Sequence, residues 1–187
     1  MKQPGLIVGV VALAVIAYIT YNSIVTEGPG SRGVEAGRDL PAFAVPLAPA
    51  SLAGPANLTE RACEVRGDDV LNVCELAERG PVVLAFFAEP IERCDDQIDV
   101  LDRLRPRFPD VQFAAVAVRG DRADLRERVR ERGWRLPVGH DETGAVANVY
   151  AVAVCPQITF AERGGEVTGT TFGSQDEAQL TRRIEAL

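Results

Sequence analysis

Residues 81–94 read PVVLAFFAEPIERC and begin the regular part of the sequence. The six residues 82–87 are all apolar, as in a strand that is covered on both faces of a sheet. Residues 95–107 follow, with apolar side chains at Ile98, Leu101 and Leu104, which is the spacing of one buried helix face. The stretch therefore predicts a buried strand that leads into a helix, with Cys94 directly before that helix.

The pattern continues towards the C-terminus and, more weakly, towards the N-terminus. Residues 41–47 alternate loosely and predict a short edge strand. The further expected elements are a strand at 111–118, helices at 121–132 and 144–150, hairpin strands at 158–161 and 167–172, and a closing helix at 175–187 with Ser174 as its N-cap. This order predicts an α/β fold, with a mixed central sheet flanked by helices.

The N-terminal part of the chain has a different character. Residues 5–25 carry no charged side chain, and about 20 apolar residues are needed to cross a bilayer as a helix. No small-residue cleavage pattern follows them, so we expect an uncleaved transmembrane anchor rather than a signal peptide. The chain then divides into a tail at 1–4, the anchor at 5–25, a linker at 26–39 and one domain at 40–187.

Composition narrows the classes of partner. The 187 residues carry a net charge of −7, which argues against a nucleic-acid partner. His140 is the only histidine, which argues against a multi-histidine metal site, and the sequence predicts no cofactor. The charges that flank the anchor give no clear orientation. Four cysteines fit an oxidising compartment, so we expect the domain on the extracytoplasmic side of the cell membrane.

Three segments resemble one protein family. They are PVVLAFFAEPIERC at 81–94, DETGAVANVYAVAVCPQITF at 141–160, and the hairpin from Gly164-Gly165 to Gly173. With the N-terminal anchor, they resemble membrane-tethered thioredoxin-fold proteins of the TlpA/ResA type, whose fold is shared by the peroxiredoxins. The resemblance covers about residues 40–187. It implies a thioredoxin-like fold, a protein thiol or disulfide as partner, and a cis-proline at Pro156.

The chain departs from this family at the reactive motif. The family carries Trp-Cys-x-x-Cys after its first core strand, and alignment on the apolar run places Pro90 at the Trp, Ile91 at the first Cys and Cys94 at the second. Ile91 has no thiol, so the usual mixed-disulfide mechanism cannot start there. The cis-proline loop of the fold faces the motif helix, which implies that Cys155, just before Pro156, pairs with Cys94. A Cα separation above about 7 Å would exclude that pair.

The remaining cysteines, Cys63 and Cys74, bracket ten residues before the first core strand. A local structural disulfide is the simplest interpretation, and closing a loop of this length contributes about 3 kcal/mol in the chain-entropy model. Four cysteines allow three pairings, of which we expect 63–74 with 94–155.

Three functional hypotheses follow from the resemblance. The first is a thiol-disulfide oxidoreductase that uses the Cys94/Cys155 pair. The second is a non-catalytic thioredoxin-like module that binds a partner and whose disulfides are structural. The third and weakest is a peroxiredoxin-like thiol peroxidase, because the family pattern Pro-x-x-x-Thr-x-x-Cys would need a Thr at Ile91 and a Pro at Phe87. The sequence alone leaves open whether the site is redox-active.

Overall fold

The computed structural model of the protein describes residues 9, 11–18, 33–52, 54–59, 61–88 and 90–187. The expected tail lies outside these residues. So does most of the expected anchor, of which residues 9 and 11–18 are described and are helical. Among the described residues, no helix combines the length and the apolar character needed to cross a membrane. The anchor therefore stays a prediction.

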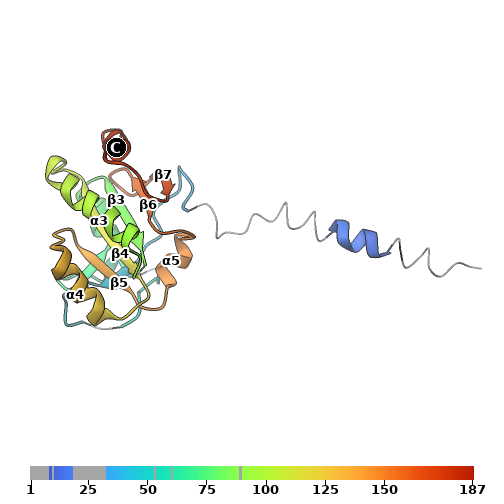
Figure 1. Ribbon diagram of the computed structural model, residues 1–187, viewed down its shortest axis with the longest axis horizontal. Helices are drawn as coiled ribbons and strands as arrows, with labels where there is room; N and C mark the ends of the chain where they lie inside the picture. The colour runs from blue at the N-terminus through green and yellow to red at the C-terminus, as the bar shows by residue number, and fades with distance from the viewer. Residues whose placement is uncertain (1–8, 10, 19–32, 53, 60, 89) are drawn as a thin grey trace, which may run out of the picture.

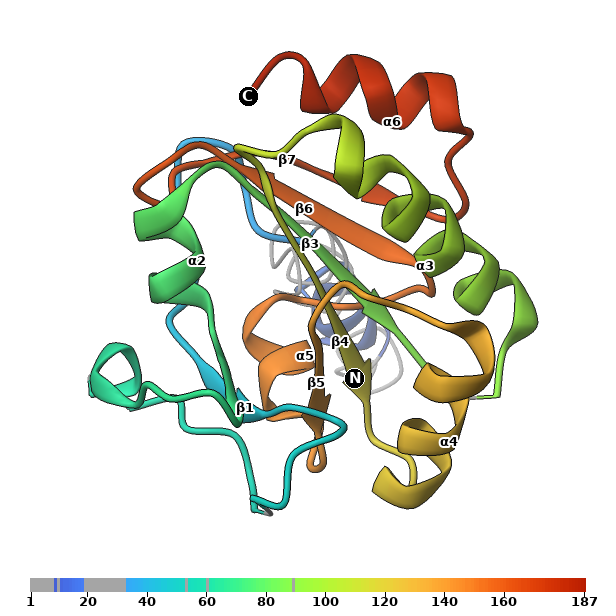
Figure 2. The ribbon, with the colours of Figure 1, turned by 90° about the vertical axis from the view of Figure 1, so that its left-hand side faces the viewer.

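A five-stranded mixed sheet forms the centre of the domain (Figures 1 and 2). The strand order is β5-β4-β3-β6-β7, with β3 parallel to β4 and antiparallel to β6. The strands are β3 (Val82–Phe87), β4 (Gln112–Val118), β5 (Val138–Asp141), β6 (Gln157–Ala161) and β7 (Val167–Phe172). Every residue of β3 is buried, as the apolar run predicts for a strand covered on both faces.

Helices cover both faces of this sheet, as Figure 2 shows. One face carries α3 (Glu92–Leu104), α4 (Arg122–Arg132) and α6 (Glu177–Ile184), and the other carries α2 (Val73–Arg79) and α5 (Ala145–Val149). Alternate residues of β3 serve the two layers: Val83 and Phe87 belong to the core beneath α3, whereas Leu84 and Phe86 belong to the core beneath α2. The α/β class with a mixed sheet is confirmed.

The expected edge strand at 41–47 does not join the central sheet. Its residues form β1 (Ala44–Pro46), which is fully buried and pairs with β2 (Val70–Asn72) in a separate two-stranded sheet. The segment before it runs beside β7, since the Gly37 N–H donates to Val167 O and the Leu40 N–H donates to Gly165 O. Residues at the end of the expected linker thus contact the central sheet.

Several element boundaries differ from the predicted ones. Helix α3 begins at Glu92 rather than at residue 95, and residues 105–107 form a separate 3-10 turn. The predicted N-cap Ser174 is wrong: Asp176 caps α6, because its side chain accepts the Gln179 N–H while the Gln179 side chain accepts the Asp176 N–H. Strand β5 and helix α2 were not predicted. These shifts leave the order of the predicted elements intact.

Candidate functional site

The first part of the site is the turn between β3 and α3. Ile91 is the N-cap of α3 and offers no side-chain cap, and the Cys94 N–H donates to Ile91 O at 2.8 Å. Cys94 therefore lies in the first turn of the helix and points into the sheet-facing core, where it is 0% exposed. A sulfur in the first turn lies close to unpaired helix N–H groups, which favour negative charge.

The second part is the loop between α5 and β6. The peptide bond between Cys155 and Pro156 is cis. The buried Gln157 side chain fixes the loop from within, because its Nε2 donates to Tyr150 O at 3.1 Å and its Oε1 accepts the Ala153 N–H at 3.2 Å. From β7, the Gly173 N–H donates to Pro156 O at 2.8 Å. The backbone around Cys155 is thus held from two sides.

These two parts meet at a disulfide between Cys94 and Cys155. Their Cα atoms are 5.7 Å apart, inside the range that a disulfide spans. A third segment reaches the same point, since the Ala88 N–H, just past the end of β3, donates to Cys155 Sγ at 3.2 Å. The two residues differ in exposure: Cys94 is fully buried, whereas Cys155 is partly exposed.

Several apolar residues are neighbours of this pair in the sequence or in the sheet. Ile91, which the resemblance aligns with the first cysteine of the family motif, packs against the core, and Pro90 before it is exposed. Val154, just before Cys155, is 43% exposed, and Phe172, which lies opposite Gln157 in the β6–β7 pair, is 41% exposed. The surface beside Cys155 therefore presents apolar area to a partner.

The surface on the other side of Pro90 is acidic. A groove of about 380 Å³ lies there, lined mainly by one face of α4. Its charged lining residues are Asp121, Asp124, Glu127, Arg128 and Glu131. Four acids against one base give this groove a negative potential.

A buried carboxylate follows Cys94 directly. Asp95 is 0% exposed and its Oδ2 lies 2.7 Å from Arg128 Nη1 and 3.5 Å from Arg132 Nη2, both on α4. Its other oxygen, Oδ1, has no hydrogen-bond partner. Burial raises the pKa of the Asp95 carboxyl above its usual value, although the positive charges of Arg128 and Arg132 act in the opposite direction. The helix that carries Cys94 is thus tied to α4 by an incompletely satisfied ion pair.

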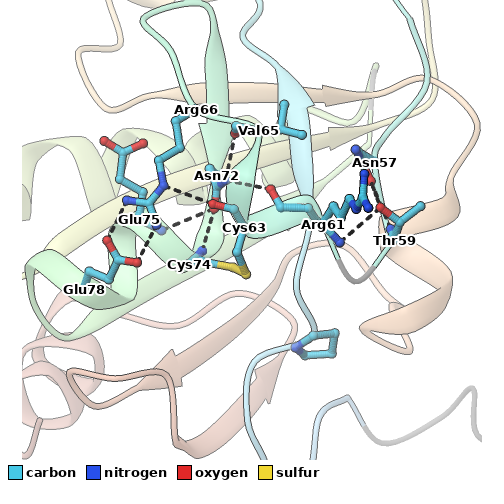
Figure 3. The surroundings of a disulfide bond; sticks show 12 residues. Asn57, Thr59, Arg61, Cys63, Val65, Arg66, Asn72, Cys74, Glu75 and Glu78 are labelled. Carbon is cyan, nitrogen blue, oxygen red and sulfur yellow. Dashed lines mark hydrogen bonds and ion pairs between the residues drawn. A yellow bond between two sulfur atoms is a disulfide. The ribbon is translucent and has the colours of Figure 1, made fainter.

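The second disulfide joins Cys63 to Cys74, with Cα atoms 5.4 Å apart (Figure 3). Asn72 supports it: its Oδ1 accepts the N–H groups of Cys74 and Glu75 at the start of α2, and its Nδ2 donates to Ala62 O and Val65 O. All four hydrogen-bonding positions of this buried amide are therefore used.

An ion pair adds a further link between the same two segments. The Arg66 guanidinium contacts both carboxylate oxygens of Glu78 and its Nε donates to Cys63 O (Figure 3). Cys74 packs with the core layer beneath α2, whereas Cys155 packs with the layer beneath α3. The two disulfides thus belong to opposite faces of the sheet.

His140 lies in β5 and is only 5% exposed. Its Nε2 lies 3.2 Å from Gly120 O, and β4 separates its strand from β3. Within the described parts of the chain, no group of three or more potential metal ligands comes together. His140 therefore has a structural partner in the fold.

Sequence patterns missed the groups that hold the site. Gln157 and the ion pair between Asp95 and Arg128 gave no signal, because their partners are brought near only by the sheet and by the packing of α3 on α4. The residues at 155 and 156 were found only through the family resemblance.

The fold has many relatives among solved structures. A protein from Chlorobium tepidum, described as a thiol:disulfide interchange protein DsbE, is 18% identical, covers 82% of this chain and 97% of its own, and has a TM-score of 0.67. A secreted disulfide oxidoreductase of Mycobacterium tuberculosis, homologous to DsbE of E. coli, is 21% identical over 63% of this chain and 89% of its own, with a TM-score of 0.57.

A third relative is the exposed lipoprotein thioredoxin Etrx1 of Streptococcus pneumoniae, 19% identical over 63% of this chain and 92% of its own, with a TM-score of 0.57. No protein-family model and no curated protein matches the sequence. At these identities the likeness establishes the architecture rather than the chemistry. The domain has the thioredoxin-like fold.

Proposed function

We propose that the domain is a thiol-disulfide oxidoreductase in which Cys94 and Cys155 form the reactive dithiol pair. The observation that carries this proposal is the disulfide between the first turn of α3 and the cis-proline loop, with Cys155 partly exposed beside apolar surface. The structural relatives described as interchange proteins and disulfide oxidoreductases share this fold and support the proposal. The partner is a protein thiol or disulfide.

The test is catalysed disulfide exchange by the full chain in detergent micelles, with insulin as substrate and dithiothreitol as reductant. Cys94→Ser and Cys155→Ser should each reduce the rate to the uncatalysed background, because either change removes one sulfur of the pair. The matched control is the double variant Cys63→Ala/Cys74→Ala, which should stay within about twofold of the unchanged protein. A rate that survives Cys94→Ser, or no rate above background in the unchanged protein, contradicts the proposal.

The second candidate is a non-catalytic module that binds its partner along the cis-proline loop. Complete burial of Cys94 and the two-sided fixation of the loop by Gln157 and Gly173 favour a static bridge. This candidate predicts no catalysed exchange but unchanged partner binding in Cys94→Ser. The peroxidase hypothesis has less support, since a peroxidatic cysteine needs an accessible thiol and Cys94 is buried and bonded.

We also propose that residues 5–25 anchor the domain to the cell membrane, with residues 40–187 on the extracytoplasmic side. The absence of charge in 5–25 and the pairing of all four cysteines support this topology, as do relatives described as secreted and as an exposed lipoprotein. The full chain should resist alkaline extraction from membranes and be cleaved by protease added to spheroplasts. Extraction by carbonate, or protection from that protease, would contradict it.

A further inference from the structure

We infer that Cys155, rather than the motif-helix cysteine Cys94, is the sulfur that exchanges with the partner, and that Cys94 is the resolving sulfur. This inference rests on the proposed function and names the order of its steps. It reverses the usual arrangement, because the reactive sulfur then lies on the cis-proline loop and the motif helix supplies only the second sulfur.

Access is the first argument. Cys94 is 0% exposed and belongs to the core beneath α3, whose members also include Ile98 and Phe87. Cys155 is partly exposed, and its neighbours Ala153 and Val154 are exposed. An attacking thiolate must approach the sulfur in line with the bond that breaks, so only the accessible sulfur can be attacked. Entry at Cys94 would require the first turn of α3 to leave the core.

Charge stabilisation is the second argument. The Ala88 N–H already points at Cys155 Sγ at 3.2 Å. The same N–H stabilises a thiolate on Cys155 in the reduced protein, and a stabilised, accessible thiolate is the nucleophilic form of cysteine. The N–H comes from the backbone just past β3, whose position is fixed by pairing with β4 and β6. The donor therefore needs no side-chain movement to act.

The leaving group is the third argument. When the partner attacks Cys155, the bond to Cys94 breaks and Cys94 takes the electron pair as a thiolate. That thiolate forms in the first turn of a 13-residue helix whose N-cap Ile91 supplies no side-chain acceptor, and the positive end of the helix dipole there favours negative charge. A better-stabilised thiolate leaves faster. Glu92, Asp95 and Asp96 act against this stabilisation. Glu92 and Asp96 are exposed to solvent and are therefore screened, and the buried Asp95 is paired with Arg128.

The exchange takes place in two steps. The thiolate of a reduced partner dithiol attacks Cys155 Sγ, which forms a partner–Cys155 mixed disulfide and releases the Cys94 thiolate. The second partner thiol, deprotonated by solvent, attacks the partner sulfur of this mixed disulfide and releases the Cys155 thiolate. The partner leaves with a disulfide and the domain with two thiols, so two electrons pass to the domain. With a partner disulfide, the same steps run in reverse.

The test traps the first step in the unchanged full chain. Oxidised protein is mixed with a limiting amount of reduced glutathione, free thiols are blocked with N-ethylmaleimide in the native state, and the peptides are mapped by mass spectrometry. Glutathione should be found on Cys155 and maleimide on Cys94. Glutathione on Cys94, or equal labelling of both, would overturn the inference.

Single variants give an independent measurement. Cys94→Ser leaves Cys155 as the free thiol and Cys155→Ser leaves Cys94, with the Cys63–Cys74 bond intact in both. The Cys155 thiol should react with a chromogenic aromatic disulfide at least about tenfold faster than the Cys94 thiol in the folded proteins, and equally fast in guanidinium. A ratio at or below one in the folded proteins contradicts the assigned order.

The two proposals fail in different ways. If the trapped glutathione is on Cys155 but the unchanged protein catalyses no exchange with insulin, the proposed function is wrong and the order of attack holds. If insulin reduction requires both cysteines but glutathione is trapped on Cys94, the function holds and the order is wrong.

Discussion

The two disulfides of the domain occupy opposite faces of the central sheet and have very different surroundings. Cys63–Cys74 joins segments that Asn72 and the Arg66–Glu78 pair already hold together, and every polar group of Asn72 is satisfied. Cys94–Cys155 joins the motif helix to a loop beside exposed apolar surface, next to the buried Asp95.

Under the proposed function, this difference distinguishes a supporting disulfide from the reactive one. A structural bond is backed by contacts that make the same connection, and its polar neighbours are fully paired. Around Cys94, by contrast, a buried carboxylate oxygen has no partner and the sulfur of Cys155 accepts a backbone N–H. Unsatisfied buried groups lower stability, and natural proteins keep them mainly where function needs them.

The largest expected effect is on stability, from removal of each disulfide as a pair of alanines. The Cys94–Cys155 bond closes a loop with a sequence separation of 61, and the Cys63–Cys74 bond one with a separation of 11. The chain-entropy model then gives losses of about 4 and about 3 kcal/mol in the free energy of unfolding. Urea unfolding of the full chain in detergent measures both. If removal of Cys63–Cys74 lowered the free energy of unfolding more than removal of Cys94–Cys155, the predicted order of the two effects would be contradicted.

The next effect concerns Asn72. Asn72→Ala removes the cap of α2 and the donor to Val65 O, and it leaves Ala62 O with only the Val65 N–H, so we expect a loss of about 2 kcal/mol in the free energy of unfolding. The matched variant Asn72→Asp keeps the two accepted bonds and loses only the donated ones, and it should cost less. A negligible loss for Asn72→Ala would show that the disulfide alone holds this segment.

The smallest effect is the pH dependence due to Asp95. Because burial raises the pKa of its carboxyl, the folded protein binds this proton more tightly than the unfolded chain does. The contribution of Asp95 to the free energy of unfolding is therefore greatest below the pKa of its carboxyl in the unfolded chain. It decreases as the pH rises through the pKa of the same carboxyl in the folded protein. Asn does not titrate, so the free energy of unfolding of the unchanged protein minus that of Asp95→Asn should fall as pH rises above the ordinary Asp pKa of about 3.9.

The opposite slope is the informative failure of this prediction. If the difference between the two proteins increases with pH, then Arg128 and Arg132 outweigh the cost of burying Asp95. The buried carboxylate next to Cys94 would then be compensated by its ion pairs, as the buried amide next to Cys74 is by its hydrogen bonds. The surroundings of the two disulfides would then differ less than we describe.

The strands that are buried on both faces could be predicted because such a strand requires a continuous run of apolar residues, which is visible in the sequence. The apolar runs of β3 and β4 and the hairpin at Gly164-Gly165 were identified for that reason. Strand β5, which reads VGHD, and the seven-residue helix α2 leave too short and too mixed a pattern. Their formation depends on tertiary partners, which a single segment does not reveal.

The candidate site was only partly predictable. Cys94 could be placed before a helix from local spacing, but its contact with Cys155 spans 61 positions and followed from the family resemblance alone. The burial of Asp95 could not be predicted, because nothing in its sequence neighbours indicates that α4 covers it. Burial of a charge depends on which helix packs beside it, and that is decided by the whole fold.

The most direct test of the account is the reduction potential of each disulfide in the full chain, measured by equilibration with thiol–disulfide buffers, alkylation of the freed thiols and mass spectrometry of the peptides. We expect a reduction potential above about −300 mV for Cys94–Cys155 and a more negative one for Cys63–Cys74, because redox-active disulfides have higher reduction potentials than structural ones. A Cys94–Cys155 potential well below about −300 mV would contradict it and leave both bonds as structural supports.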